Sequence, residues 1–355
     1  MEKKSKAEFA DLIAEATSDK VDELKKVIEK QRKSIDRLKD KKLDLIEAMN
    51  FAIESNLAEL NLRPVKPPTK SKRKTKHEEI CVPLLSDIQL AKITPTYSTE
   101  VAEERVVRYA HKIVELTKIQ RASHKIDKCV VLALGDIVEG ELIFPGQAHL
   151  IDSSLYSQVT VDGPRILHKF FNVLLQNFTE VECHWVIGNH GALGGRSRKD
   201  MHPETNADAM LGNIVQRIFA DEPRLTFHLA YKKGEKAWYT VADLGKKCRF
   251  FMFHGDQVRG FAGFPWYGFG KKIQGWKTLA AQGLMEDFDY AVAGHFHTPN
   301  TQYINDIRFW CNGSTESYNT FAQEQLASMG RPCQYTLFVK PDKGVTAEYL
   351  VNLEE

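Results

Sequence analysis

Five short polar segments recur along this chain, and four of them close an apolar run. They are Asp87-Ile88-Gln89, Gly135-Asp136, Gly188-Asn189-His190, His254-Gly255-Asp256 and Gly294-His295-Phe296-His297. The runs that precede the first four cover residues 81–85, 129–134, 183–187 and 248–253. Short runs rich in β-branched and aromatic residues predict buried strands. Because ligand sites in open α/β sheets form where strands end, the pattern predicts that Asp, Asn and His side chains gather at one rim as a metal site.

Each segment alone is a weak signal. A Gly-Asp pair after a strand is usually a turn, and His254 alone fits a histidine that simply ends a strand. His295 and His297 are two residues apart, so an extended segment places both imidazoles on one face, although an exposed edge strand would do the same. The occurrence of all five segments in this order favours the metal site.

In this order the segments resemble the signature of the calcineurin-like metallophosphoesterases, over roughly residues 80–350. The resemblance implies an α/β fold, a two-layered β-sandwich flanked by helices, and a hydrolase that uses two divalent metal ions. It implies that Asp136 bridges the metals and that His190 stays unligated and faces the substrate phosphate. The other implied ligands are Asp87, Gln89 and His297 for one metal, and Asn189, His254 and His295 for the other. Asn312-Gly313-Ser314 resembles versions carried by tailed bacteriophages.

Gln89 departs from this family pattern, which normally has histidine at that position. An amide oxygen is a weaker and harder ligand than an imidazole, so the exchange favours Mn²⁺ over Zn²⁺, with Mg²⁺ and Fe as further candidates. The alternative is that Gln89 hydrogen-bonds a ligand without touching the metal.

The same residue types suit phosphoryl chemistry on physical grounds. Two divalent ions about 3.5–4 Å apart clamp a phosphoryl group and lower the pKa of a bridging water, and Asp136 has the two oxygens that a bridge needs. The remaining ligands are mostly neutral, which leaves positive charge for the phosphate. His190 would then hydrogen-bond the developing charge or protonate the leaving oxygen as a general acid. The sequence has no Gly-x-Ser-x-Gly elbow and no Gly-x-x-x-x-Gly-Lys loop, so acyl transfer and P-loop chemistry lack their usual motifs.

Composition agrees with a large enzyme domain. The chain has 355 residues, 43% of them hydrophobic, and a net charge of +2, so any affinity for nucleic acid must be local. The six cysteines form no Cys-x-x-Cys pair and are expected to be small buried residues in a reducing cytoplasm, the host's if the protein is viral. The charged start and the lack of an 18-residue apolar stretch argue against a signal peptide and a membrane partner.

The first 62 residues differ from the rest, because they contain neither glycine nor proline. Apolar residues alternate there at spacings of three and four between Val21 and Ala52, a coiled-coil pattern with charged flanks. A single helix of this kind cannot bury its apolar stripe. We therefore expect residues 1–60 to drive self-association to a dimer or higher oligomer; the alternative is that the helix folds back on its own catalytic domain.

A basic linker at 63–78 would join this segment to a metallophosphoesterase domain at 79–355. Residues 63–76 carry seven basic and no acidic side chains, with prolines that stiffen the segment. It is either a tether for a DNA or RNA backbone or a solvated spacer. Stretches near Val101–Leu116 and Ile166–Leu175 are expected to be amphipathic helices that cover the sheets.

Two insertions border the predicted rim. One carries Arg196, Arg198 and Lys199 on a glycine-rich loop, where they would bind substrate phosphate or stay solvated. The other, residues 260–272, interleaves five aromatic residues with glycines and ends in two lysines. Such a loop would stack the bases of a single strand, or form a packed lid or a subunit contact.

The sequence thus predicts a metal-dependent phosphoesterase, and more specifically a phosphodiesterase or nuclease acting on nucleic acid. Two alternatives remain open. One is a phosphatase or diesterase for small nucleotides or phosphoprotein. The other is a non-catalytic, metal-binding accessory subunit of a nucleic-acid machine.

Overall fold

The computed structural model describes residues 25–26, 28–33, 51, 55, 65–68, 78–193, 202, 204–230, 238–260, 263–319, 323 and 330–354. The chain divides into two compact units, Met1–Ser55 and Asn56–Glu355. In the first unit, residues 25–26 and 28–33 are helical and exposed. Most of the predicted coiled coil and of the basic linker lies outside the described residues, so both stay predictions, as do the domain boundaries.

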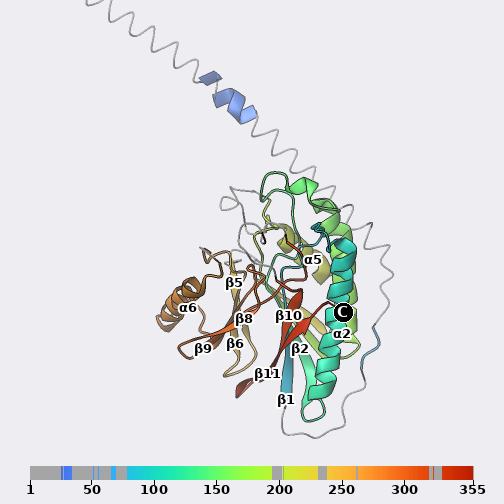
Figure 1. Cartoon of the computed structure of the whole chain (residues 1–355), viewed down its shortest axis with the longest axis vertical. Helices are drawn as coiled ribbons and strands as arrows, with labels where there is room; N and C mark the ends of the chain where they lie inside the picture. The colour runs from blue at the N-terminus through green and yellow to red at the C-terminus, as the bar shows by residue number, and fades with distance from the viewer. Residues whose placement is uncertain are drawn as a thin grey trace, which may run out of the picture. The chain divides into compact units, whose positions relative to one another are not determined.

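The second unit contains two β-sheets (Figure 1). The first sheet has the strand order β11-β10-β1-β2-β3-β4. Its parallel strands are β1 (Glu78–Leu85), β2 (Lys125–Ala133), β3 (Glu180–Trp185) and β4 (Leu225–Leu229). Two antiparallel strands, β10 (Cys333–Lys340) and β11 (Gly344–Asn352), extend it beyond β1.

The second sheet has the order β5-β6-β7-β9-β8. Parallel pairing joins β6 (Arg249–Phe253), β7 (Tyr290–Ala293) and β9 (Ile307–Cys311). The antiparallel edges are β5 (Tyr239–Asp243) and β8 (Asn300–Ile304). The predicted apolar runs are thus confirmed as β1, β2, β3 and β6.

The two sheets pack face to face through one apolar core, as the sandwich prediction required. Alternate residues point inward, so Val82 and Leu84 of β1 lie in the same buried cluster as Phe250 and Trp310 of the second sheet. Burying one such large side chain contributes roughly 1.5–3 kcal/mol. This core fixes the two sheets against each other, and with them the loops at the strand ends.

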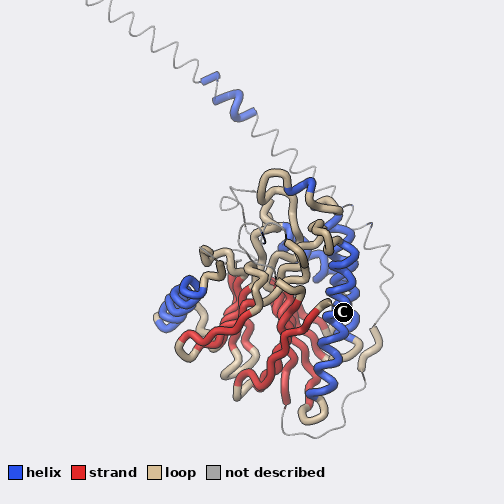
Figure 2. Tube along the Cα trace, viewed as in Figure 1, coloured by secondary structure: helices blue, strands red, loops and turns tan. Residues whose placement is uncertain are grey.

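Helices cover the outer faces of both sheets (Figures 1 and 2). On the first sheet lie α2 (Thr99–Gln120), α4 (Gly163–Leu175) and α5 (Ala207–Ile218). The Tyr109 hydroxyl of α2 donates to the Tyr335 carbonyl of β10 at 2.6 Å. The helices predicted near 101–116 and 166–175 are therefore confirmed. Short helical turns occupy Gln147–His149, Leu155–Ser157 and Gln158–Asp162.

The second sheet is covered by α6 (Trp266–Ala281), which corrects one expectation. The aromatic segment 260–272 was expected to be a loop, but a helix begins at Trp266. The reason is a buried stripe at helical spacing, since Phe269, Ile273 and Trp276 pack with Phe251 of β6. The glycines there are tolerated because this packing outweighs their low helix propensity.

All six cysteines are buried and reduced, as expected of small core residues. Within the part of the chain that the structure describes, no helix is both long enough and apolar enough to cross a membrane.

Candidate metal centre

The five polar segments follow β1, β2, β3, β6 and β7, and their loops gather at one end of both sheets (Figure 2). Two contacts tie the sheets together there. His254 Nδ1 lies 2.8 Å from the Leu134 carbonyl at the end of β2. The backbone N–H of His295 donates to both carboxylate oxygens of Asp87 at 3.0 Å. Side chains from distant parts of the sequence therefore share one rim, as the strand-end pattern indicated.

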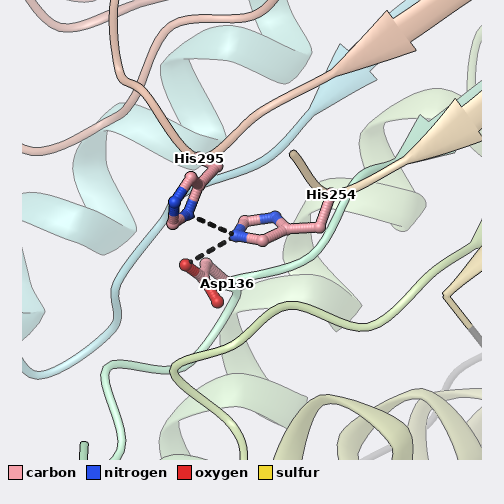
Figure 3. A group of neighbouring side chains, drawn as sticks. All are labelled: Asp136, His254 and His295. Atoms are coloured by element: carbon pink, nitrogen blue, oxygen red, sulfur yellow. Dashed lines mark hydrogen bonds and ion pairs between the residues drawn. The ribbon is translucent and has the colours of Figure 1, made fainter. Parts of the chain in front are cut away.

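Asp136, His254 and His295 converge in Figure 3, with ligand atoms that all lie within 4.8 Å of one another. His254 Nε2 lies at the centre of the group. It is 2.9 Å from Asp136 Oδ2, 3.2 Å from His295 Nδ1 and 3.1 Å from Asn189 Oδ1. One imidazole nitrogen carries at most one proton, so it cannot satisfy three neighbours of this kind by hydrogen bonding.

This group fits a metal ion. A carbonyl only accepts hydrogen bonds, so Leu134 fixes the proton of His254 on Nδ1 and turns the Nε2 lone pair towards Asp136. In its neutral form, the form that binds a metal, His254 then leaves the buried Asp136 Oδ2 without a donor among the described residues. A divalent ion would accept electron pairs from Asp136, Asn189, His254 and His295 together, two oxygens and two nitrogens.

Asp87 and His297 form a second, adjoining pair. His297 Nε2 lies 3.2 Å from Asp87 Oδ1, and its Nδ1 lies 2.5 Å from Glu316 Oε1. A carboxylate behind a histidine is the usual support of a metal-binding imidazole, because it fixes the ring and its tautomer. These two residues therefore fit a metal as well.

The side-chain amide of Gln89 makes hydrogen bonds at both of its ends. The Lys92 ammonium lies 2.6 Å from Gln89 Oε1 and 2.5 Å from Glu316 Oε2. Lysine can only donate, so the amide oxygen must face Lys92 and the NH₂ group must face His297 Nε2, 3.1 Å away. The geometry favours the alternative in which Gln89 is a hydrogen-bonding neighbour of the ligands.

Replacing Gln89 with histidine tests this assignment. We expect Gln89→His to tighten Mn²⁺ or Zn²⁺ binding at the Asp87–His297 position by about tenfold or more, because an imidazole supplies a lone pair where the amide NH₂ now lies. Lys92→Met should act in the same direction but more weakly, by freeing the amide oxygen. Calorimetric titration measures both; unchanged affinity in Gln89→His would show that the position lies too far from the ion to ligate.

His190 lies beside the metal group and is held by the carboxylate of Glu139. Its backbone N–H donates to Asp136 Oδ1 at 2.8 Å, and its Nδ1 is 3.1 Å from both Glu139 O and Glu139 Oε2. Its Nε2 lies 4.0 Å from Asp136 Oδ2, in a partly exposed position. Burial lowers the pKa of His190, but the charges of Asp136 and Glu139 outweigh burial and raise it to about 9. A histidine so placed keeps a proton at neutral pH.

Asp208, at the start of α5, supports the centre without joining it. It accepts the backbone N–H groups of Asp136 at 2.8 Å and Gly188 at 2.9 Å, which follow β2 and β3. Burial, then the Asp136 charge, raises the pKa of Asp208 to about 6. Sequence reasoning missed Asp208, Glu139, Lys92 and Glu316, because no local pattern marks a carboxylate or ammonium that acts on a distant loop.

The glycines of two motifs are explained by close approach. A Cβ on Gly188 would lie 2.1 Å from Asp136 Oδ1, and one on Gly294 would lie 2.3 Å from Asp87 Oδ2. Any side chain at either position would displace the carboxylate of a candidate ligand. The Gly-Asn-His and Gly-His-x-His segments therefore begin with glycine for steric reasons.

The motif backbones adopt an unusual conformation. Asp87, Gln89, Asp136, His295 and His297 have φ between 45° and 72°, in the left-handed region that non-glycine residues seldom occupy. They are five of the eight such residues in the described part of the chain. Strained backbone of this kind clusters at functional sites.

The metal-free protein is expected to lose stability as pH rises from about 6.5 to about 10. Burial lowers the pKa of His254 and His297, but the neighbouring carboxylates outweigh it and raise both to about 10. Groups whose folded pKa lies above the unfolded value of about 6.5 stabilise fully below 6.5 and cease to do so above the folded value. Thermal unfolding in chelator should show the decline, and excess Mn²⁺ should reduce it by replacing these protons. A melting temperature that stays constant from pH 6.5 to 9 would contradict the assignment.

The predicted substrate-binding residues Arg196, Arg198 and Lys199 lie outside the described residues. A hollow of about 880 Å³ along α2, lined by Glu103, Arg108 and other charged residues, shares no residue with the centre.

Neither a family model nor a curated protein matches the sequence. Solved structures similar to it include a novel archaeal phosphodiesterase, with 12% identity over 76% of this chain and 99% of the other, at a TM-score of 0.34. A predicted phosphoesterase from Streptococcus pneumoniae TIGR4 shows 12% identity over 77% and 98%, at a TM-score of 0.30. Vacuolar protein sorting 29 from Cryptosporidium parvum shows 13% over 78% and 99%, at 0.36.

These identities and TM-scores carry no information about substrate or activity. The resemblance rests instead on the order of the five segments and on the group of ligand-type side chains that they build. On these two observations, the chain is similar to the calcineurin-like metallophosphoesterases.

Proposed function

We propose that this protein is a metal-dependent phosphoesterase, and specifically a phosphodiesterase acting on nucleic acid. The observation that supports the enzyme class best is the convergence of Asp136, Asn189, His254 and His295 around His254 Nε2, with His190 beside them. Asp136 is the only carboxylate in this set. A divalent ion held there would keep a net positive charge, which a phosphate needs.

In such a reaction some residues of the chain would hold the metal ions, and His190 would transfer a proton. Asp136, Asn189, His254 and His295 would hold one ion, and Asp87 and His297, with Asp136 as a bridge, a second. The ions would polarise the phosphoryl group and lower the pKa of an attacking water. His190 would donate a proton from Nε2 to the leaving oxygen, while Glu139 holds its Nδ1 and keeps it protonated. We propose Mn²⁺ as the ion, because half of the donor atoms of the first group are oxygens.

An aromatic surface next to the centre supports a nucleic-acid substrate. Trp266 and Tyr267 are 50% and 82% exposed and line a hollow of about 510 Å³ together with Lys271. Ring contacts lead from Trp266 to Phe264, with centroids 4.5 Å apart, and from Phe264 to Phe296, 5.4 Å apart. Phe296 stands between His295 and His297. Bases of a single strand gain about 1–3 kcal/mol each by stacking on such rings.

A panel of substrates in the presence of Mn²⁺ tests the proposal. It compares labelled single-stranded DNA, double-stranded DNA and RNA with bis-p-nitrophenyl phosphate and p-nitrophenyl phosphate. We expect turnover of the diester and of at least one nucleic acid. Turnover of the monoester alone would identify a phosphatase instead, and no turnover of any substrate would favour a non-catalytic module.

A double substitution in the aromatic surface tests the nucleic-acid substrate separately from the phosphoesterase activity. Trp266→Ala with Tyr267→Ala should reduce cleavage of single-stranded nucleic acid and leave hydrolysis of bis-p-nitrophenyl phosphate unaffected, because the small diester carries no nucleobase to stack on the rings. Equal losses on both substrates would mean that these residues act on the centre itself. Unchanged cleavage of nucleic acid would refute the aromatic surface as its binding site.

Self-association through residues 1–60 remains a proposal that the truncated chain can test. Every candidate ligand lies beyond residue 86, so deletion of residues 1–60 should lower the oligomeric state yet largely retain small-diester hydrolysis. Long nucleic acids should suffer more, through lost avidity between linked sites. Light scattering measures the assembly; a truncated chain with the full-length state would refute the coiled coil.

A further inference from the structure

A second group of ligand-type side chains lies in the first sheet, away from the metal centre. It consists of Glu182 and His184 of β3 and His228 of the edge strand β4. One ligand atom from each residue lies within 4.8 Å of the other two. None of the five motifs contributes to this group, and the proposed reaction does not use it.

The strand register brings these three side chains together. His184 and His228 are direct partners across the parallel β3–β4 pair, and their rings lie 4.3 Å apart at an angle of 18°. Glu182 precedes His184 by two residues, so both side chains point from the same face of β3. His228 is exposed, whereas His184 is buried. The group is therefore held by the sheet on one side and reachable from solvent on the other.

Lys128 of β2 binds one oxygen of the Glu182 carboxylate and leaves the other oxygen facing His184. Its ammonium lies 2.5 Å from Glu182 Oε1, while Glu182 Oε2 lies 3.8 Å from His184 Nε2. That second distance is too long for a hydrogen bond. It is close to the roughly 3.4 Å that separates two ligands of a tetrahedral ion with bonds of about 2.0–2.1 Å. Outer contacts such as that of Lys128 orient metal-binding carboxylates in general.

The ligand types of this group indicate which metal it would bind. Two imidazoles and one carboxylate are a set that Zn²⁺, Ni²⁺ and Cu²⁺ favour over Mg²⁺ and Ca²⁺.

We propose that Glu182, His184 and His228 form a second metal site, for a transition-metal ion of the Zn²⁺ class, with an open coordination position towards solvent. Three protein ligands and one open position match the ligand count of zinc sites that bind an exchangeable water. His184 lies within β3, whereas Asn189 lies in the loop that follows this strand, and the two sites share no residue.

The test uses the full-length chain with the first centre disabled. In the Asp136→Asn/His254→Ala protein, calorimetric titration with Zn²⁺ should still show one ion bound, which His228→Ala weakens at least tenfold. Lys128→Met should weaken it about 10–100-fold, the usual effect of removing an outer contact. Thr226→Ala is the matched control, because Thr226 lies two residues before His228 on the same strand face, and it should leave the Zn²⁺ affinity unchanged.

A second measurement covers the case in which the doubly substituted protein fails to fold. His228→Ala alone should bind one Zn²⁺ fewer than the wild type while it retains Mn²⁺-dependent diester turnover. Cu²⁺ bound to the wild type should show nitrogen couplings in its electron paramagnetic resonance spectrum that His184→Ala diminishes. A His228→Ala protein with wild-type zinc stoichiometry and affinity would overturn the proposal.

Discussion

Replacing Asp136 with asparagine is expected to abolish Mn²⁺ binding at the candidate centre and to reduce diester turnover by about 10³-fold or more. Asp136 is fully buried, and its Oδ2 lies 2.9 Å from His254 Nε2. It is the one carboxylate of the Asp136–Asn189–His254–His295 group. An amide has no charge and only one oxygen, so it can neither bridge two ions nor neutralise one. Loss of metal assistance is worth several kcal/mol, and about 1.4 kcal/mol corresponds to a factor of ten.

Two measurements check this result. Calorimetric titration should show lost or much weaker Mn²⁺ binding, and initial rates with bis-p-nitrophenyl phosphate should fall in parallel. Asp256→Asn makes the same chemical change two residues after His254, outside the candidate ligands, and should preserve both properties. Wild-type stoichiometry in Asp136→Asn would refute the bridge, and lost binding in both variants would point to unfolding rather than to a missing ligand.

Replacing His190 with alanine is expected to lower turnover by about 10²–10⁴-fold while metal binding stays intact. Its ring contacts Glu139 through Nδ1 and presents Nε2 to the rim, whereas the candidate ligand atoms surround His254 Nε2. The loss should be smaller for a substrate with a good leaving group such as p-nitrophenolate, which needs little protonation. Loss of metal in His190→Ala would mean that the histidine is itself a ligand.

Glu139→Gln gives this assignment a pH-dependent test. The acid form of His190 exists below its pKa, so activity should fall as pH rises through that value. Removal of the Glu139 charge lowers the pKa, because that charge is one of the causes that raise it. The alkaline limb of the profile should therefore move to lower pH, with little change in metal affinity. An unmoved limb would assign it to another group.

The strands that build the centre were predictable because their signal is local. Apolar runs ending in Asp, Asn or His mark both a buried strand and the place where its loop begins. Parallel strands of one sheet present such ends at the same edge, so the meeting of Asp87, Asp136 and Asn189 follows from the pattern. The pattern did not show that β6 and β7 belong to a second sheet, because no local signal in the sequence records which sheet will pack on which.

The features of the site and fold that were not predicted depend on contacts between residues far apart in the sequence. Lys92 binds both the amide oxygen of Gln89 and the carboxylate of Glu316, which lies far along the chain, so no local spacing records how the Gln89 amide is oriented. Helix α6 was missed because glycines between aromatic residues are typical of loops, while the stripe that makes it a helix acquires its meaning from Phe251 on the sheet below. Asp208 acts on two backbone loops at once, and no spacing in the sequence records that.

Transplanting this centre into another protein would require the left-handed backbone conformation of the motif residues as well as their side chains. Side-chain identity alone does not carry the site, because Asp87, Asp136, His295 and His297 reach their positions only with φ above zero. A host sandwich given the same residues at ordinary extended strand ends would aim them in other directions. A functional transplant must therefore include the complete loops, together with Gly188, Gly294 and Asp208, which accepts backbone N–H groups of these loops. What has to be transferred is a set of backbone turns and not only the ligand residues.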